Sequence, residues 1–255
     1  MMNKIDGDLK KLLAFYTVLG RPLNTNEIST LIPNTELSLV SKTLGKLKKK
    51  KIVIENGGFF ILEAGNSGVL IPTENIFEKR KRQDELLDKK WKIFVSHKNI
   101  FNNVPFIEFV FISGSMALGN VHENSDFDLI IGCKKGRIFT IRFLLALFFD
   151  FKGVRRAKSD IVSTIDTKDK ICLNHFITKD TYCLRGPYHF QWQQLYLNLV
   201  PILGSKQSID DFFNSNAIWL NGEPRRLFDY WDFGKPNFIA KFTKFILGGW
   251  FGNLF

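Results

Sequence analysis

The sequence predicts an α/β (α+β) fold in which a mixed sheet occupies the middle of the chain, with short helices and a hairpin before it and further helices after it. Two short apolar strand signatures, 109–112 and 129–131, are followed by an apolar segment of helical length, 138–151. A third strand signature lies at 170–177. The 255 residues are enough to form one sizeable core and a smaller additional domain.

The expected elements divide the chain into four parts. In chain order these are a small helical domain with a hairpin at 1–65, a linker and connecting helix at 66–100, the α/β core at 101–186 and a helical carboxyl-terminal region at 187–255. Two helices are expected in the last part, at 188–203 and 209–220, because aromatic and aliphatic residues recur there at helical spacing.

The amino-terminal part shows three helical patterns and a hairpin. Apolar residues recur at helical spacing from Asp8 to Leu19, and a second short helix is expected from Thr25 to Leu31. A third helix, capped by Thr35, extends to about Lys48, and a hairpin with its turn at 56–58 follows it. This order of elements resembles a winged helix, a family in which the third helix commonly enters a DNA groove.

The third helix carries polar and basic residues that suit either of two roles. They contact DNA, or they form a solvated helix end favoured by the helix dipole while the module docks on its neighbour. The residues are Ser38, Ser41, Lys42, Lys46 and the run Lys48 to Lys51. A second basic cluster, 79–82, lies on the expected connecting helix at 75–95 and is more typical of a solvated face.

Charge and cysteine content limit the partners and the compartment. The formal charge of +11 and the pI near 9.5 predict a polyanionic partner, which can be nucleic acid, nucleotide phosphate or an anionic membrane surface. The three cysteines have no CxxC spacing and an odd total, which predicts a reducing compartment. The polar amino terminus lacks the apolar stretch of a secretory signal, so we expect a cytoplasmic protein.

No segment predicts a membrane span. The apolar run 138–151 is interrupted by Thr140 and Arg142 and is too short to cross about 30 Å of hydrocarbon, so a buried helix is expected. The last segment, 242–255, mixes aromatic residues with glycines. We expect it to pack on the core rather than on a membrane surface.

The first candidate functional motif follows the strand at 109–112. The strand leads directly into Ser113, Gly114 and Ser115 and then into a short helical segment. A turn of this kind presents backbone N–H groups and a serine hydroxyl at the positive end of a helix, which suits the oxygens of a triphosphate.

The second motif is a pair of aspartates at the start of the next strand. Asp126 and Asp128 are separated by Phe127, so both carboxylates lie on one face of the strand while Phe127 and Leu129 face the core. Two carboxylates on one face repel each other unless a hard divalent cation lies between them, and such a cation also binds phosphate oxygens. The pattern predicts Asp126 and Asp128 as metal ligands.

Gly114 and Ser115, a spacer and then Asp126-Phe127-Asp128-Leu129 resemble the signature of the DNA polymerase β-like nucleotidyltransferase superfamily, over about residues 107–178. The resemblance implies transfer of a nucleoside monophosphate from a nucleoside triphosphate to an acceptor, with release of pyrophosphate. It implies that Gly114 and Ser115 hold the triphosphate and that the aspartates hold Mg²⁺ or Mn²⁺. ATP is one candidate donor, and the acceptor is a small molecule, a protein or RNA. Ser125 is a further candidate for nucleotide binding or for bracing Asp126.

The resemblance also implies a third carboxylate on a later strand, and this sequence departs from that pattern. The strand at 170–177 places Asn174 at the expected position, and we take Asn174 as the candidate third catalytic residue. Competing positions are Asp160, Asp166 and Asp169. If the position is neutral, His175 is a candidate proton acceptor, although a histidine beside a strand is more often structural. Basic candidates for the phosphates are Arg137, Arg142, Arg155, Arg156 and Lys158.

Three other interpretations of the paired aspartates fit the sequence less well. Glycosyltransferases also use an Asp-x-Asp motif after a strand, without a Gly-Ser turn upstream, and an EF-hand requires polar residues or glycine where Leu129 and Ile130 lie. A structural pair of aspartates needs cationic partners that the local sequence does not supply. The alternative from another class is a non-catalytic, nucleotide-sensing, DNA-binding winged-helix regulator with a degenerate nucleotidyltransferase core.

Overall fold

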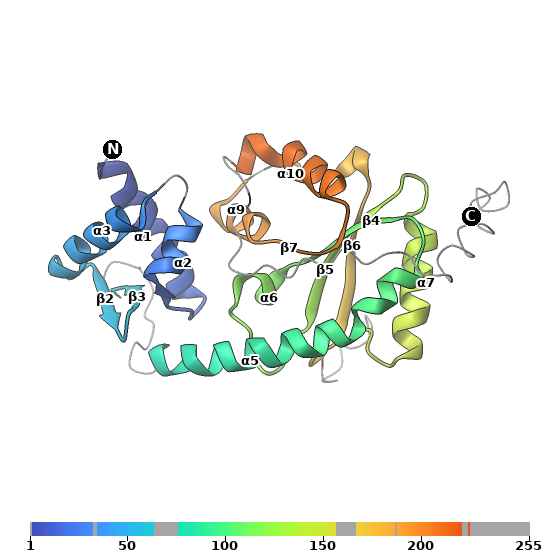
Figure 1. Cartoon of the computed structure of the whole chain (residues 1–255), viewed down its shortest axis with the longest axis horizontal. Coiled ribbons are helices and arrows are strands. Elements are labelled where there is room, and N and C mark those ends of the chain that lie inside the picture. Colours follow the sequence, from blue (N-terminus) through green and yellow to red (C-terminus); the bar gives the residue numbers. More distant parts are fainter. Residues whose placement is uncertain are drawn as a thin grey trace. The chain divides into compact units, whose positions relative to one another are not determined.

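The computed structural model describes residues 2–32, 35–63, 76–156, 167–186, 188–220 and 224 (Figure 1). It falls into two compact units that divide at Leu86 and Leu87, and each unit is described by itself below. The predictions for the linker that begins at 66, for Lys158, Asp160 and Asp166 and for the segment 242–255 concern residues outside the described ranges.

The first unit contains three helices and a small antiparallel sheet. In chain order the elements are α1 (Met2–Val18), β1 (Leu23–Asn24), α2 (Thr25–Leu31), α3 (Leu37–Lys49), β2 (Val53–Asn56) and β3 (Phe59–Leu62). The strand order is β1-β3-β2. This is the order of helices and hairpin that the sequence predicts, and the identification of the unit as a winged helix stays a prediction.

Local sequence explains the turns of this unit. Asn56 pairs with Phe59 across Gly57 and Gly58, which have φ values of +58° and +83°, as a two-residue hairpin turn of type I′ requires. Asn24 caps α2 through a capping box with Glu27. The prediction that Thr35 caps α3 is wrong: the carbonyl of Glu36 accepts the first helical N–H groups, so Glu36 is the cap residue.

Helix α5 (Ile76–His97) carries the basic cluster 79–82, and one member of this cluster is buried. Arg80 donates to Glu27 at 2.8 Å and to Asp84 at 2.9 Å, and buried Arg21 also donates to Asp84 at 3.1 Å. The other three members of the cluster are exposed. The expectation of a solvated face therefore holds for three of the four residues, and Arg80 is a structural residue of the first unit.

The second unit is built on a mixed four-stranded sheet of order β6-β5-β4-β7. Its strands are β4 (Ile107–Ile112), β5 (Phe127–Cys133), β6 (Ile171–Ile177) and β7 (Val200–Gly204). The β4 strand is antiparallel to β5 and β7, whereas β5 and β6 are parallel. The helical elements are η2 (Lys98–Asn103), α6 (Gly114–Leu118), α7 (Ile138–Phe151), η3 (Lys179–Thr181), α9 (Phe190–Leu197) and α10 (Lys206–Leu220).

Aromatic residues fill the core on both faces of this sheet. On one face Phe94 of α5 contacts Phe127 and Phe101, and Phe101 in turn contacts Phe149 of α7. On the other face Phe109 and Phe111 of β4 pack against Phe212 of α10, the helix that lies with α9 above the sheet in Figure 1. The sheet is therefore covered on both sides, as the predicted α/β class requires.

The helix predicted at 188–203 ends early. Helix α9 stops at Leu197, and Val200–Gly204 forms the edge strand β7 beside β4. Buried Val200 and Ile202 favour a strand, and Pro201, which would break a helix, is tolerated in an edge strand because it lacks only one N–H donor. The periodicity of the aromatic residues obscured this boundary.

The helix predicted at 138–151 has these bounds, but the expectation that it is buried holds for one face only. Ile141, Leu145 and Phe149 are buried. The opposite face exposes four large apolar residues at a spacing of four, with 52% to 87% of each exposed: Phe139, Phe143, Leu147 and Phe151. We call these four residues the α7 stripe. No helix among the described residues is long and apolar enough to cross a membrane.

Candidate active site

The turn after β4 brings the backbone against a carboxylate. Ser113 precedes α6 and donates its N–H to the carbonyl of Asp128 at 2.9 Å. Gly114 has a φ of +61°, and a Cβ atom at this position would overlap the carboxylate of Asp128. The turn therefore requires glycine for its conformation and for its close approach to Asp128. Ser115, predicted to bind the triphosphate, is the second residue of α6 and is half-buried.

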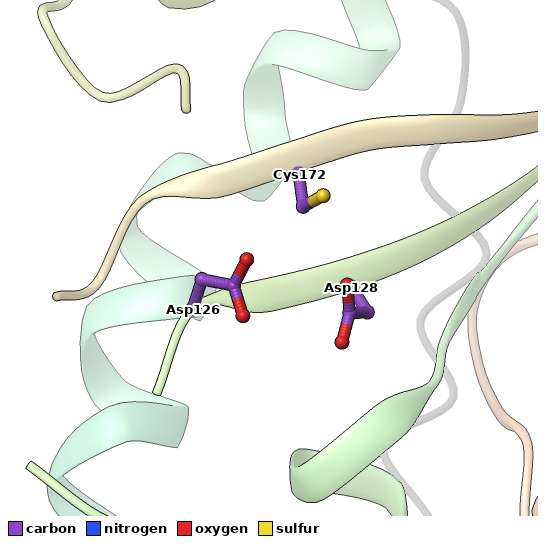
Figure 2. A group of neighbouring side chains, drawn as sticks. All are labelled: Asp126, Asp128 and Cys172. Atoms are coloured by element: carbon purple, nitrogen blue, oxygen red, sulfur yellow. The ribbon is translucent and has the colours of Figure 1, made fainter. Parts of the chain in front are cut away.

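The two aspartates lie as their spacing predicts. Asp126 immediately precedes β5 and Asp128 is the second residue of that strand, whereas Phe127 and Leu129 are buried in the core. Figure 2 shows both carboxylates near the start of the strand. Burial, and then the neighbouring charge of Asp126, raise the pKa of Asp128, while a hydrogen bond from Cys172 and the charge of Arg156 oppose this shift.

A cysteine completes the group. Cys172 on β6 pairs in parallel register with Asp128, and ligand atoms of Asp126, Asp128 and Cys172 all lie within 4.8 Å of one another (Figure 2). Burial, followed by the charges of Asp128 and Asp126, raises the pKa of the Cys172 thiol to about 12, so the thiol is neutral at pH 7. Sequence reasoning missed Cys172, because its place beside Asp128 depends on the register of two strands.

The described candidates for the third catalytic residue lie on β6 or just before it. Asn174 lies on β6, where the register shifts between the pairs Asp128–Cys172 and Ile130–His175; its side chain is outside the description, and its catalytic role stays a prediction. Asp169 pairs with Lys90 at 2.6 Å. Burial lowers the pKa of His175, which favours the neutral imidazole that its predicted role as a proton acceptor needs.

Of the basic candidates, Arg156 reaches the aspartates. Its Nη1 donates to Oδ2 of Asp126, and its charge opposes the rise in the pKa of the Cys172 thiol. Its backbone N–H donates to the carbonyl of Ile171 at 2.9 Å, which fixes the residue beside the start of β6. The other described candidates have different contacts: Arg155 pairs with Asp150, Arg137 lies over the ring of Phe106 and Arg142 lies over the ring of Phe176.

Ser125 and its neighbours shape the loop before Asp126. The Ser125 hydroxyl accepts the N–H of His122 at 2.9 Å, and the N–H of Ser125 donates to the carbonyl of His122. The Ser125 side chain is buried. These contacts fix the loop one residue before Asp126, and both predicted roles of Ser125, bracing Asp126 and binding a nucleotide, stay predictions.

A buried lysine fastens this loop to the segment that leads into β6. Lys90 of α5 has 1% of its side chain exposed, and its Nζ donates to the carbonyl of Ser125 at 2.8 Å, to the carbonyl of Glu123 at 3.1 Å and to Asp169 at 2.6 Å. Three oxygens thus satisfy the ammonium group. Sequence reasoning missed Lys90, which looks like a solvent-facing residue of a charged helix.

One comparison with known proteins found a match, and it lies within the second unit. Residues 96–185 match the family model described as "Polymerase beta, Nucleotidyltransferase". A comparison with curated proteins found no match, and neither did a comparison with solved structures. The matched region contains the turn, both aspartates, Cys172 and Arg156. Over residues 96–185 the chain is therefore similar to the polymerase β-like nucleotidyltransferase superfamily. Members of this superfamily generally use divalent metal ions, and Asp126 and Asp128 form an acidic group suited to one.

Replacing the buried lysine should unfold the site. Lys90→Met leaves Asp169 and two carbonyl groups without their cation, so we expect a loss of about 3–5 kcal/mol in the free energy of unfolding of the second unit. Chemical denaturation followed by tryptophan fluorescence measures this loss. Lys92→Met is the control, because Lys92 is exposed on the same helix. Equal stability of the two variants would contradict a structural role for Lys90.

Adding one methyl group at Gly114 should displace Asp128. Gly114→Ala places a Cβ atom against the Asp128 carboxylate, so we expect a loss of about 100-fold in the nucleotidyl transfer that is proposed below. The control is Gly136→Ala, because Gly136 also has a positive φ, +75°, but has open space around its Cα. Both variants place alanine at a positive φ. If they lose activity equally, the close approach of the turn to Asp128 is not what matters.

The raised pKa of Asp128 predicts how stability depends on pH. A carboxyl whose pKa is higher in the folded state destabilises the fold once the pH exceeds the unfolded value near 3.8, and fully so above the folded pKa. Asp128→Asn should therefore raise the melting temperature of the metal-free protein at neutral pH and have no such effect below that unfolded value. Thermal unfolding in a chelator across this range measures the difference. A melting temperature that falls at neutral pH would refute the assigned cause.

Proposed function

We propose that this protein is a metal-dependent nucleotidyltransferase that transfers a nucleoside monophosphate from a nucleoside triphosphate to an acceptor. The observation that carries the proposal is the convergence of the Gly114 turn on Asp128, beside Asp126 and Cys172, inside a region that matches a nucleotidyltransferase family. A triphosphate needs backbone N–H groups close to its oxygens, and its cation needs carboxylate ligands at the same place.

The carboxylates of Asp126 and Asp128 hold a divalent cation, Mg²⁺ or Mn²⁺, in this proposal. The donor set fits a hard cation because two carboxylates lie close together on one strand face, and burial followed by the charge of Asp126 raises the pKa of Asp128 when no cation is bound. When bound, the cation supplies positive charge to the triphosphate and to the entering oxygen.

The residues of the chain position the reactants. Backbone N–H groups of Gly114 and Ser115 and the hydroxyl of Ser115 orient the phosphates, and the Gly114 position lets the phosphates come close to the main chain. Arg156 supplies a fixed positive charge beside Asp126. The acceptor attacks the α-phosphorus in line and pyrophosphate leaves. His175, kept neutral by burial, and Asn174 are the β6 candidates for contact with the acceptor.

A donor screen tests the proposal. The protein is incubated with each of the four α-labelled nucleoside triphosphates and Mg²⁺ or Mn²⁺, together with a pool of small-molecule, protein and RNA acceptors. We expect metal-dependent label transfer and pyrophosphate release from at least one triphosphate, both lost in Asp126→Asn/Asp128→Asn. Glu123→Gln serves as the control, because Glu123 is an exposed acid of the same loop. Binding of a triphosphate without turnover would favour the regulator instead.

One feature of the first unit supports contact with DNA as a second function. The outward face of α3 exposes Ser38, Ser41, Lys42, Lys46 and Lys49. The buried positions of the helix, Val40, Leu44 and Leu47, lie on its other side. An exposed basic helix face of this kind suits the phosphates of a duplex groove, as in winged-helix proteins. We therefore propose that the first unit binds duplex DNA through α3.

Salt dependence distinguishes this contact from nonspecific charge. If Lys42 and Lys46 each neutralise one phosphate, Lys42→Ala/Lys46→Ala should weaken duplex binding and reduce the slope of log K against log salt by about 2. The matched control is Lys4→Ala/Lys11→Ala, which removes the same charge from exposed positions on α1. Fluorescence anisotropy with a labelled duplex measures both slopes. Equal changes in the two variants would show that only net charge matters.

A further inference from the structure

The candidate metal group is poor in hard ligands. Of its three members, only Asp126 and Asp128 are carboxylates, and the third is the thiol of Cys172. Mg²⁺ prefers oxygen ligands, whereas sulfur suits softer ions. Two hard cations held about 3.5–4 Å apart need carboxylate oxygens for both. The described donors therefore suit one hard cation better than two.

Arg156 already occupies part of this group. It donates to Oδ2 of Asp126, so the other carboxylate oxygen of Asp126 is left for a cation. The bond from its N–H to the Ile171 carbonyl, and the bridge of Arg155 to Ile171, fix the backbone at this position. The guanidinium group is thus held beside the aspartates by β6 rather than carried on a free loop.

Arg156 also has a hydrogen-bond donor that no described residue accepts. Its Nε atom is buried and has no hydrogen-bond partner among the described residues. A buried donor without a partner is unfavourable by itself, and a phosphate oxygen is the kind of acceptor that a guanidinium group binds in pairs of parallel hydrogen bonds.

We propose that Arg156 takes the place of a second metal ion: one divalent cation binds to Asp126 and Asp128, and the Arg156 guanidinium neutralises the remaining charge on the triphosphate. This inference rests on the proposed function. It assigns Arg156 as a catalytic residue that contacts the phosphates. Cys172 is a positioning residue, because its small side chain leaves room for the guanidinium group beside Asp126 and Asp128.

Counting bound metal tests this assignment without turnover. Mn²⁺ is titrated into the protein saturated with a non-hydrolysable triphosphate analogue, and bound ions are counted by calorimetry and by electron paramagnetic resonance. We expect one Mn²⁺ per wild-type complex and no spin-coupled pair. The variant Arg156→Ala/Cys172→Asp replaces the guanidinium by a third carboxylate, and we expect it to bind two. Arg156→Lys, which keeps a cation, should bind one.

The outcomes separate this inference from the proposed function. Two ions in the wild type would overturn the role of Arg156 and leave the nucleotidyltransferase intact. No bound Mn²⁺ in the presence of the analogue would overturn both. Cys172→Ser is the matched control, since it keeps a small neutral group and should still bind one ion. Circular dichroism checks that each variant is folded.

The α7 stripe is an exposed apolar surface outside the site. At roughly 150–250 Å² for a large side chain, the exposed parts of Phe139, Phe143, Leu147 and Phe151 present about 500 Å² of apolar surface. Monomeric proteins rarely leave such a stripe uncovered. Two copies would bury about 1,000 Å² in total, close to the lower limit of a specific interface.

Charges beside the stripe favour a second copy of this chain. Arg142 and Asp150 are exposed and lie eight residues apart on α7; within one copy Arg142 lies over the ring of Phe176 and Asp150 pairs with Arg155, and a second copy would compete with these exposed contacts. In an antiparallel pair of identical helices related by a two-fold axis near Ala146, Arg142 of each copy meets Asp150 of the other. We propose that α7 mediates a weak, antiparallel homodimer.

Sedimentation over about 1 to 100 μM tests the dimer. We expect a monomer–dimer equilibrium that Phe143→Glu abolishes and Ile218→Glu preserves, since Ile218 is 97% exposed on α10 and lies outside the stripe. Arg142→Glu should weaken the dimer, and Arg142→Glu/Asp150→Arg should restore it. A monomer at every concentration would overturn the proposal. Binding to anionic vesicles that depends on Phe143 would then assign the stripe to a lipid surface.

Discussion

The buried ammonium group of Lys90 sets the relation between the two strands that carry the site. It binds backbone oxygens of Glu123 and Ser125, one residue before Asp126, and the carboxylate of Asp169, two residues before β6 begins. Lys90 links the segments just before β5 and β6. This link fixes, at the start of both strands, the register that places Cys172 beside Asp128. Without this tie, two loops would have to hold the register by themselves.

The fold brings together two carboxylates whose negative charges repel each other. Asp126 and Asp128 repel, and the fold places the Gly114 turn against one of them, which removes water from that carboxylate. Arg156 relieves part of this repulsion. Packing of the aromatic core on both faces of the sheet offsets this unfavourable electrostatic energy. The core holds β5 in position whether or not a ligand is bound.

Features encoded in a few neighbouring residues could be predicted from the sequence. The alternation of Asp126, Phe127 and Asp128 fixes which side chains share a face, and the Gly57-Gly58 pair fixes the hairpin turn. Features that depend on distant segments could not. The position of Cys172 depends on the strand register, and the role of Lys90 depends on residues more than thirty positions away. Strand β7 was missed because aromatic periodicity outweighed the signal of Pro201, and the outer face of α7 because hydrophobicity was equated with burial.

The three free cysteines differ in chemical reactivity as a result of where the fold places them. Burial raises the pKa of Cys133 and of Cys172 to about 12, so neither forms the thiolate that reacts with peroxide or alkylating agents. Cys183 is exposed, just after η3. A thiol-reactive dye would therefore attach at one position of the native protein, next to the aromatic core yet away from the carboxylates. The thiol within the site would remain reduced under oxidising conditions that modify the surface.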